Sequence, residues 1–181
     1  MQLETIKGEP VGTPVNQELD IQNPETVTET TISAGENILL LSEHNPNVYR
    51  LRTTVSSSCG EDEKVTRFGF REFKKEGKRF HVNGQPTFLR GTLECCIFPL
   101  TGYPAMANSN WEKIYRTCKE FGLNHVRFHS WCPPEAAFNV ADSMGIYLQV
   151  ECGAWATVGD GGYIDQWLYE EGDRILKEYG N

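Results

Sequence analysis

The sequence predicts a multi-domain chain in which a β region over residues 1–74 precedes an α/β region over residues 75–181. In the first region, short runs rich in Val, Ile, Thr and Tyr alternate with turns that contain Pro, Asn and Gly. The second region repeats the order strand, loop, helix, and the glycines that end its first two helices, Gly122 and Gly145, lie 23 residues apart. Because an apolar run follows each glycine, we expect parallel strands joined by right-handed crossovers.

The β region contains two clear predicted strands, Thr26–Ile32 and Val48–Val55. In the second strand, Tyr49 and its alternate neighbours form an apolar face opposite two arginines, which indicates a half-buried strand of an antiparallel sheet. Ser56–Glu63 reads as a polar connection and Lys64–Phe73 as a further strand. With five or six strands in total, we expect an incomplete immunoglobulin-like β-sandwich.

A hairpin and the first βα unit follow. Asn83-Gly84 separates two apolar runs, and both residues tolerate positive φ, so the pair predicts a type I′ turn. Thr87–Arg90 is the first predicted parallel strand. Ser109 and Glu112 have the spacing of a capping box at the start of a helix, and Gly122 stands where such a helix ends.

Two more units complete the α/β region. Leu123–Phe128 and Ile146–Val150 are the second and third predicted strands, and the helix between them starts after Pro133-Pro134 and ends at Gly145. The third helix is predicted over Asp165–Tyr179. Its expected inward residues are Trp167, Leu168, Ile175 and Leu176.

Three βα units are too few to close a barrel, which needs about 250 residues. We therefore expect the chain to hold the first part of a larger parallel fold. The partner that this part lacks is the remainder of the parent chain. Open strand edges of this kind predict poor solubility or self-association when the remainder is absent.

Composition and charge exclude several classes of protein. With 17 basic and 25 acidic side chains the net charge is −8, which argues against nucleic acid or an anionic membrane as a partner. The chain has no apolar run of membrane-spanning length, and residues 1–10 lack the features of an export signal. The six cysteines form no CxxC pair, so we interpret them as reduced thiols and predict no metal site.

Polar and aromatic residues follow each predicted parallel strand, at the edge where such folds carry their chemistry. These candidate substrate-binding residues are Glu94 after the first strand, Arg127, His129 and Trp131 at the second, and Glu151 and Trp155 after the third.

Alternative roles remain open for these residues. Glu94 and Glu151 fit either an acid/base pair or hydrogen-bond acceptors for Arg90 and Arg127. A retaining glycosidase needs its two carboxyl groups about 5–5.5 Å apart, whereas strands one and three are next-nearest neighbours, roughly 9.6 Å apart. His129 is either a substrate donor or a packed imidazole. The two tryptophans either stack on sugar rings or fix loops to the scaffold.

Several segments resemble glycoside hydrolase family 2. Asn47–Leu51, Arg67–Arg71 and Val82–Gly91 are similar to the end of its immunoglobulin-like domain and the entry to its TIM barrel. Asn124–Phe138 resembles the second barrel strand and helix, and Gly145–Glu151 resembles the third strand.

The resemblance implies that residues 75–181 hold the first three βα units of a TIM (β/α)₈ barrel. It further implies retaining hydrolysis of β-linked sugars without a cofactor, and rim positions for Arg127, His129, Trp131 and Glu151. Many members have a histidine directly before the aromatic residue of the second-strand motif, where this chain has Ser130.

The resemblance supplies no catalytic residue within this chain. In the family, the acid/base glutamate follows an asparagine at the end of strand four, and the nucleophile ends strand seven. The chain contains no Asn-Glu dipeptide, so both glutamates are predicted beyond Asn181 and the isolated chain is predicted inactive. The alternative is a non-catalytic carbohydrate-binding or interaction module. The compartment stays open, and a periplasmic or secreted parent is compatible with the resemblance.

Overall fold

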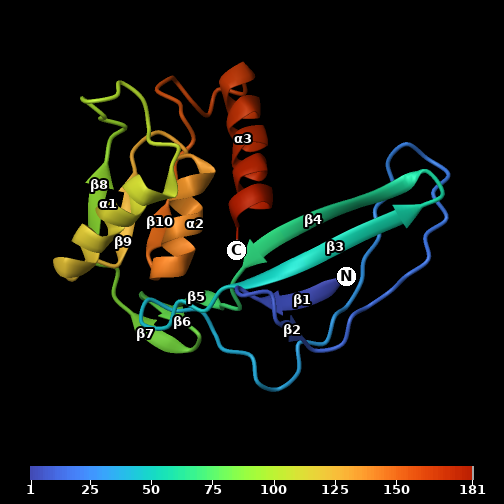
Figure 1. The fold of residues 1–181 in the computed structure, drawn as a ribbon. Coiled ribbons are helices and arrows are strands. Elements are labelled where there is room, and N and C mark those ends of the chain that lie inside the picture. Colours follow the sequence, from blue (N-terminus) through green and yellow to red (C-terminus); the bar gives the residue numbers. More distant parts are fainter. Residues whose placement is uncertain (181) are drawn as a thin grey trace.

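The computed structural model describes residues 1–180 and contains ten strands and three helices within them. Figure 1 shows a long antiparallel ribbon beside an α/β unit, with a small sheet below the α/β unit in this view. The strands are β1 (Gln2–Thr5), β2 (Pro10–Val11), β3 (Tyr49–Ser57), β4 (Gly60–Phe68), β5 (Phe73–Glu76), β6 (Arg79–Val82), β7 (Gln85–Thr87), β8 (Gly91–Glu94), β9 (His125–Phe128) and β10 (Tyr147–Gln149). The helices are α1 (Asn108–Glu120), α2 (Glu135–Met144) and α3 (Tyr163–Tyr179).

The antiparallel ribbon is a four-stranded sheet in the order β2-β1-β3-β4. β3 and β4 pair from Tyr49↔Phe68 to Ser57↔Gly60, so the connection predicted over residues 56–63 is mostly paired strand. Tyr49 is buried, but the half of β3 that approaches Ser57 is exposed on both faces. The prediction of a half-buried strand therefore holds only for the first half of β3.

An ion-pair cluster fixes the register of β1 against β3. The Glu4 carboxylate accepts hydrogen bonds from Arg50 Nη2 at 2.7 Å and Arg52 Nε at 2.7 Å, and Arg52 also pairs with Glu63. The hydrogen bonds from Arg52 and Arg50 lower the pKa of Glu4 to about 2. Glu4 is buried, and its charge is compensated by the two arginines.

Two strand predictions in this region are wrong. Thr26–Ile32 forms no strand, and Val27 is 87% exposed. Among residues 1–180 no strand pairs with this segment, and β propensity acts through such neighbours. Lys64–Phe73 is two strands rather than one, because β4 ends at Phe68. Leu41 packs so closely on Gly69 that a Cβ there would lie 2.4 Å from its side chain.

The small sheet has the order β5-β6-β7. Asn83 and Gly84 join β6 to β7 with φ values of 52° and 75°, which confirms the predicted hairpin turn. Asn83 also ties this sheet to the preceding chain, because its side-chain amide donates to the Leu41 carbonyl at 2.9 Å.

The third sheet is parallel, in the order β10-β9-β8, as the βα repeat predicts. Its first strand is β8, four residues later than the predicted Thr87–Arg90. That prediction is wrong because Thr87 ends β7 and pairs with Phe80. Gly91 starts β8 where a side chain would collide with His125: a Cβ would lie 2.4 Å from the imidazole.

α1 and α2 cover one face of the parallel sheet and form the main core with it. The buried residues of this core are Trp111, Tyr115, Cys118, Val126, Phe128, Ala136, Ala137, Val140, Ala141 and Ile146. Gly122 and Gly145 end the helices with φ values of 73° and 67°, which confirms both predicted ends. The predicted capping box is wrong, because α1 begins one residue before Ser109, after Ala107, and no side chain caps it.

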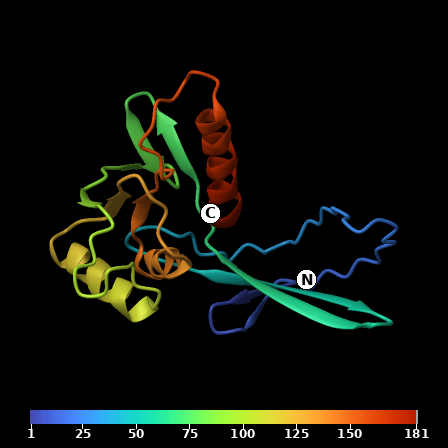
Figure 2. The same ribbon diagram turned by 90° about the horizontal axis from the view of Figure 1, so that it is seen from above.

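α3 lies beside α2 and above the end of β4 (Figures 1 and 2). It starts at Tyr163, two residues before the predicted start, and buries none of its residues fully. Trp167, Leu168 and Ile175 are half-buried, whereas Leu176 is 70% exposed and does not face inward as predicted. None of the helices in residues 1–180 combines the length and apolar character that a membrane crossing needs.

Candidate functional site

The candidate site lies at the carboxyl edge of the parallel sheet, on the face opposite α1 and α2. Along β9, Val126 and Phe128 point into the helix-covered core, so His125 and Arg127 point to the other face. Arg127 pairs in register with Leu93 of β8 and Gln149 of β10. This open face of the sheet presents Arg127 at its centre.

Arg127 and Glu151 form the central ion pair of the site. Arg127 Nε and Nη2 lie 2.6 and 2.5 Å from Glu151 Oε1, and the Ser130 backbone N–H donates to Glu151 Oε2 at 2.8 Å. The Ser130 amide and then Arg127 lower the pKa of Glu151. Since both carboxylate oxygens accept hydrogen bonds, Glu151 is a fixed anion rather than a free base.

Ser130 organises the aromatic side of the site. It has a φ of 60°, unusual for a residue with a side chain, and this conformation directs its amide to Glu151. Its hydroxyl accepts a hydrogen bond from Trp155 Nε1 at 2.7 Å. The His129 ring meets the Trp155 ring edge to face, with centroids 5.7 Å apart. Trp155 is 83% exposed, so most of its ring remains available to a ligand.

Trp131 lies apart from this arrangement. Its ring packs edge to face on Phe98 and Phe128, with centroids 6.1 and 5.3 Å away, at the margin of the core. Its indole N–H is buried and has no hydrogen-bond partner among the described residues. These contacts fix the loop after β9 to the sheet.

Glu94 is not brought together with Glu151. It is in register with Phe128, and its carboxylate accepts hydrogen bonds from the backbone N–H groups of Cys96 at 2.9 Å and Ile97 at 3.4 Å. Phe128 points into the helix-covered core, so Glu94 lies on that face of the sheet rather than on the open face that carries Arg127 and its partner Glu151. The Glu94 side chain instead stabilises the turn after β8.

His125 and the cysteines complete the residues considered from the sequence. His125 is half-buried deeper in β9, and burial lowers its pKa. Burial also raises the pKa of Cys132 to about 11, which keeps this thiol protonated at neutral pH. No group of three His, Cys, Asp or Glu residues in the described chain is placed to hold a metal ion.

Comparisons with known proteins match most of the chain, although no family model does. A curated β-galactosidase of Thermoanaerobacterium thermosulfurigenes is 32% identical over 128 residues, which cover 69% of this chain and 18% of that protein. A β-galactosidase of Staphylococcus xylosus is 27% identical over 138 residues, 74% of this chain and 14% of that protein. The chain thus spans less than a fifth of the length of these relatives.

Solved structures agree in fold with almost the whole chain. A β-glucuronidase of Parabacteroides merdae superimposes with a TM-score of 0.75 and 23% identity, over 98% of this chain and 21% of its own. A glycosyl hydrolase family 2 member of Bacteroides cellulosilyticus gives a TM-score of 0.78 with 19% identity, over 98% of this chain and 24% of its own. The chain belongs to glycoside hydrolase family 2.

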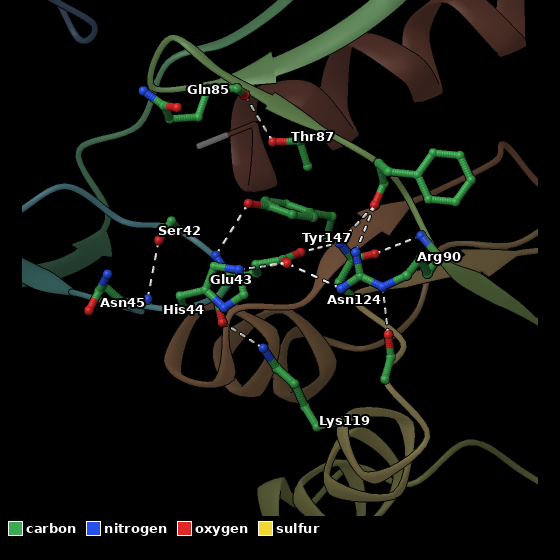
Figure 3. A network of polar contacts seen from close by, with 12 residues as sticks. Ser42, Glu43, His44, Asn45, Gln85, Thr87, Arg90, Lys119, Asn124 and Tyr147 are labelled. Atoms are coloured by element: carbon green, nitrogen blue, oxygen red, sulfur yellow. Dashed lines mark hydrogen bonds and ion pairs between the residues drawn. The ribbon is translucent and has the colours of Figure 1, made fainter.

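In this family 2 chain a second polar cluster, which the sequence did not reveal, lies at the opposite, amino edge of the parallel sheet (Figure 3). Its centre is Glu43, whose carboxylate accepts hydrogen bonds from Asn124 Nδ2 and from Arg90 Nη2, the latter at 3.1 Å. The Glu43 carbonyl accepts from Lys119 Nζ at 2.6 Å, and its backbone N–H donates to the Tyr147 hydroxyl at 3.3 Å. We call these five residues the Glu43 cluster.

The Glu43 cluster holds the segment before β3 against the start of the parallel strands. Asn124 is 1% exposed and also donates to the Phe88 carbonyl at 3.1 Å and accepts from the Arg90 N–H at 2.7 Å. Gly145 allows the closest approach, because a Cβ there would lie 2.8 Å from the Glu43 backbone. These contacts among its own members position the segment before β3 on the family 2 scaffold.

Proposed function

We propose that this chain supplies part of the substrate-binding rim of a retaining glycoside hydrolase that acts on β-linked sugars. The observation that carries the proposal is the Arg127–Glu151–Ser130–Trp155 arrangement at the carboxyl edge of a parallel sheet, the edge at which such folds bind substrates. The curated relatives named as β-galactosidases support this substrate class.

We further propose that residues 1–74 are the end of an immunoglobulin-like domain and that residues 75–181 are the first three βα units of a TIM barrel. The chain order β8, β9, β10 equals the spatial order, and α1 and α2 lie on one face, as in consecutive barrel units. Both edges of this sheet lack a paired strand within residues 1–180, where further barrel strands would continue it.

The residues at the edge take different parts in this proposal. Trp155, with His129 against its ring, offers an aromatic face and an imidazole donor to a sugar. Arg127 and Glu151 hold each other and Ser130 in place, and their outer atoms contribute hydrogen bonds to sugar hydroxyls. Trp131 and Glu94 position the loops that follow their strands.

The chemistry of double displacement needs one protonated and one ionised carboxyl group on either side of the glycosidic bond. The Ser130 amide and Arg127 favour the ionised form of Glu151, and Glu94 faces the turn after β8, so neither glutamate is assigned to the reaction. The two catalytic glutamates of the parent enzyme then come from sequence outside the 181 residues.

The test uses the 181-residue chain and two readouts. Nitrophenyl β-galactoside, β-glucuronide and β-mannoside should give no turnover, whereas the corresponding free sugars should quench the fluorescence of Trp155 at millimolar concentration. Trp155→Phe should abolish the quenching, and Trp167→Phe on α3 is the matched control that should retain it. Turnover that disappears in Glu151→Gln would contradict the inactive rim, and unchanged quenching in Trp155→Phe would contradict the sugar site.

A further inference from the structure

A cavity of about 620 Å³ lies between the end of β4, α2 and α3, on the helix-covered side of the parallel sheet. It is separate from the carboxyl-edge site, since its floor belongs to the face of β10 that packs toward the helices. The cavity exists because α3 stands away from the sheet and buries none of its residues fully. The Tyr179 ring of α3 stacks on the Phe138 ring of α2, with ring centroids 3.9 Å apart, and this contact ties α3 to α2.

The floor of the cavity is aliphatic. Leu148, Val150 and Ile175 line it and are half-buried. The two aromatic residues in its wall, Phe138 and Tyr179, cover each other's faces with an interplanar angle of 3°. Because the stacked faces of these rings are not free for a sugar, the floor suits a branched aliphatic group better than a carbohydrate.

Two opposite charges face this cavity without touching each other. Asp142 on α2 and Arg71, between β4 and β5, both line it and are half-buried. Within residues 1–180 neither side chain forms a hydrogen bond or ion pair, although the charges of Arg67 and then Arg71 act on the carboxylate of Asp142. Burial raises the pKa of Asp142 to about 6, and the charges of Arg67 and Arg71 oppose this rise.

The charged residues that line the cavity are nearly balanced. Four are basic and three are acidic, in a chain whose net charge is −8; they are Lys64, Arg67, Arg71 and Lys177 against Glu135, Asp142 and Glu178. A lining of this kind favours neither a simple anion nor a simple cation. It complements a molecule that carries both charges close together.

We propose that this cavity binds a small zwitterion with an aliphatic body, of the chemical class of the apolar α-amino acids. The ligand's ammonium group donates to Asp142, and its carboxylate accepts from the guanidinium of Arg71, a pairing that favours planar, two-point contact. Its side chain lies on Leu148, Val150 and Ile175. Each charged group of the ligand thereby meets a side chain that forms no hydrogen bond or ion pair in the described structure.

The experiment is calorimetric titration of the 181-residue chain with L-leucine and with two probes that each lack one charge, 4-methylpentanoate and 3-methylbutylamine. Leucine should bind, and each single-charge probe should bind about tenfold or more weakly, because it loses one charge-assisted contact. Asp142→Asn and Arg71→Gln should each weaken leucine binding about tenfold. Asp160→Asn, in an exposed loop, is the matched control that should bind leucine as the parent chain does.

Failure of the amino-acid site in the cavity can be distinguished from failure of the sugar site at the carboxyl edge of the sheet. Ile175→Trp fills the floor without changing a charge, so it should block leucine even where Asp142→Asn fails to fold. Trp155→Phe should leave leucine binding unchanged while it abolishes sugar quenching. Absence of leucine binding at millimolar concentration, equal affinity for 4-methylpentanoate, or loss of binding in Trp155→Phe would each overturn the proposal.

Discussion

Asn124 is the residue of the Glu43 cluster on which stability should depend most. Its side chain is buried and makes three hydrogen bonds, to the Glu43 carboxylate, the Phe88 carbonyl and the Arg90 N–H. Asn124→Ala removes all three at once. The Arg90 N–H then loses its partner beside the buried position 124, while Glu43 retains Arg90 as a partner.

The size of the effect follows from these partners. A buried polar group that loses its partner costs about 1–3 kcal/mol, and a hydrogen bond whose partner stays satisfied contributes roughly 0.5–1.5 kcal/mol. One orphaned N–H and two weakened acceptors therefore predict a loss of about 3 kcal/mol of unfolding free energy. With a urea m-value of about 2 kcal/mol/M, the midpoint should fall by about 1.5 M.

The assay is equilibrium urea unfolding of the 181-residue chain, followed by the fluorescence of its tryptophans. Asn110→Ala is the matched control, because Asn110 is exposed on α1 and its side chain accepts a hydrogen bond from its neighbour Ser109. Its midpoint should change by the equivalent of no more than about 0.5 kcal/mol. A shift for Asn124→Ala as small as that of the control would refute the reasoning that the cluster stabilises the fold.

Three further outcomes are expected. Gly145→Ala should lower the thermal midpoint more than Gly77→Ala. Both glycines have positive φ, but of the two only Gly145 would place a Cβ against backbone, 2.8 Å from Glu43. Equal midpoints would contradict the close approach of the Glu43 backbone to Gly145. Stability should fall as the pH drops from about 4.5 toward 2, because the folded-state pKa of Glu4 lies below its ordinary value; urea unfolding across this range should show a flatter profile for Glu4→Gln. Burial raises the pKa of the Cys132 thiol to about 11, so at pH 7 this thiol should react with iodoacetamide more slowly than the exposed Cys59. Peptide mass spectrometry measures both rates, and equal rates would contradict the burial of Cys132.

The parts of the fold that depend on local chemistry could be predicted from the sequence. Gly122 and Gly145 end helices because a left-handed residue is needed there, and Asn83-Gly84 forms its turn for the same reason. The parallel order of β8, β9 and β10 follows from the βα repeat alone. Each of these features is decided by residues within a few positions of one another.

The sequence-based predictions fail where residues far apart in the chain determine the structure. Thr26–Ile32 has strand propensity, but no strand in the described part of the chain pairs with it. Thr87 was assigned to the parallel sheet, yet it pairs with Phe80 in the small one. The Glu43 cluster was not foreseen because its hydrogen bonds join residues 47 to 104 positions apart, and no local pattern marks such partners.

The candidate site shows the same division. Arg127 and Glu151 could be selected because strand alternation and strand ends are local signals, and the structure joins them. The separation of Glu94 from Glu151 depends on which face each strand end turns toward, which the sequence did not fix. Ser130, which links Glu151 to Trp155, was noted only as a departure from the family motif.

The long reach of the Glu43 cluster has a consequence for biosynthesis. Glu43 leaves the ribosome well before Asn124 and Tyr147. Its side chain and backbone therefore lack these hydrogen-bond partners until the later residues have been synthesised. Contacts this far apart in the chain form late and slowly, because a large loop must close before they can stabilise anything. During translation, the hydrogen bonds that hold the Glu43 segment against the βα units can therefore form only after the chain has been synthesised through Tyr147.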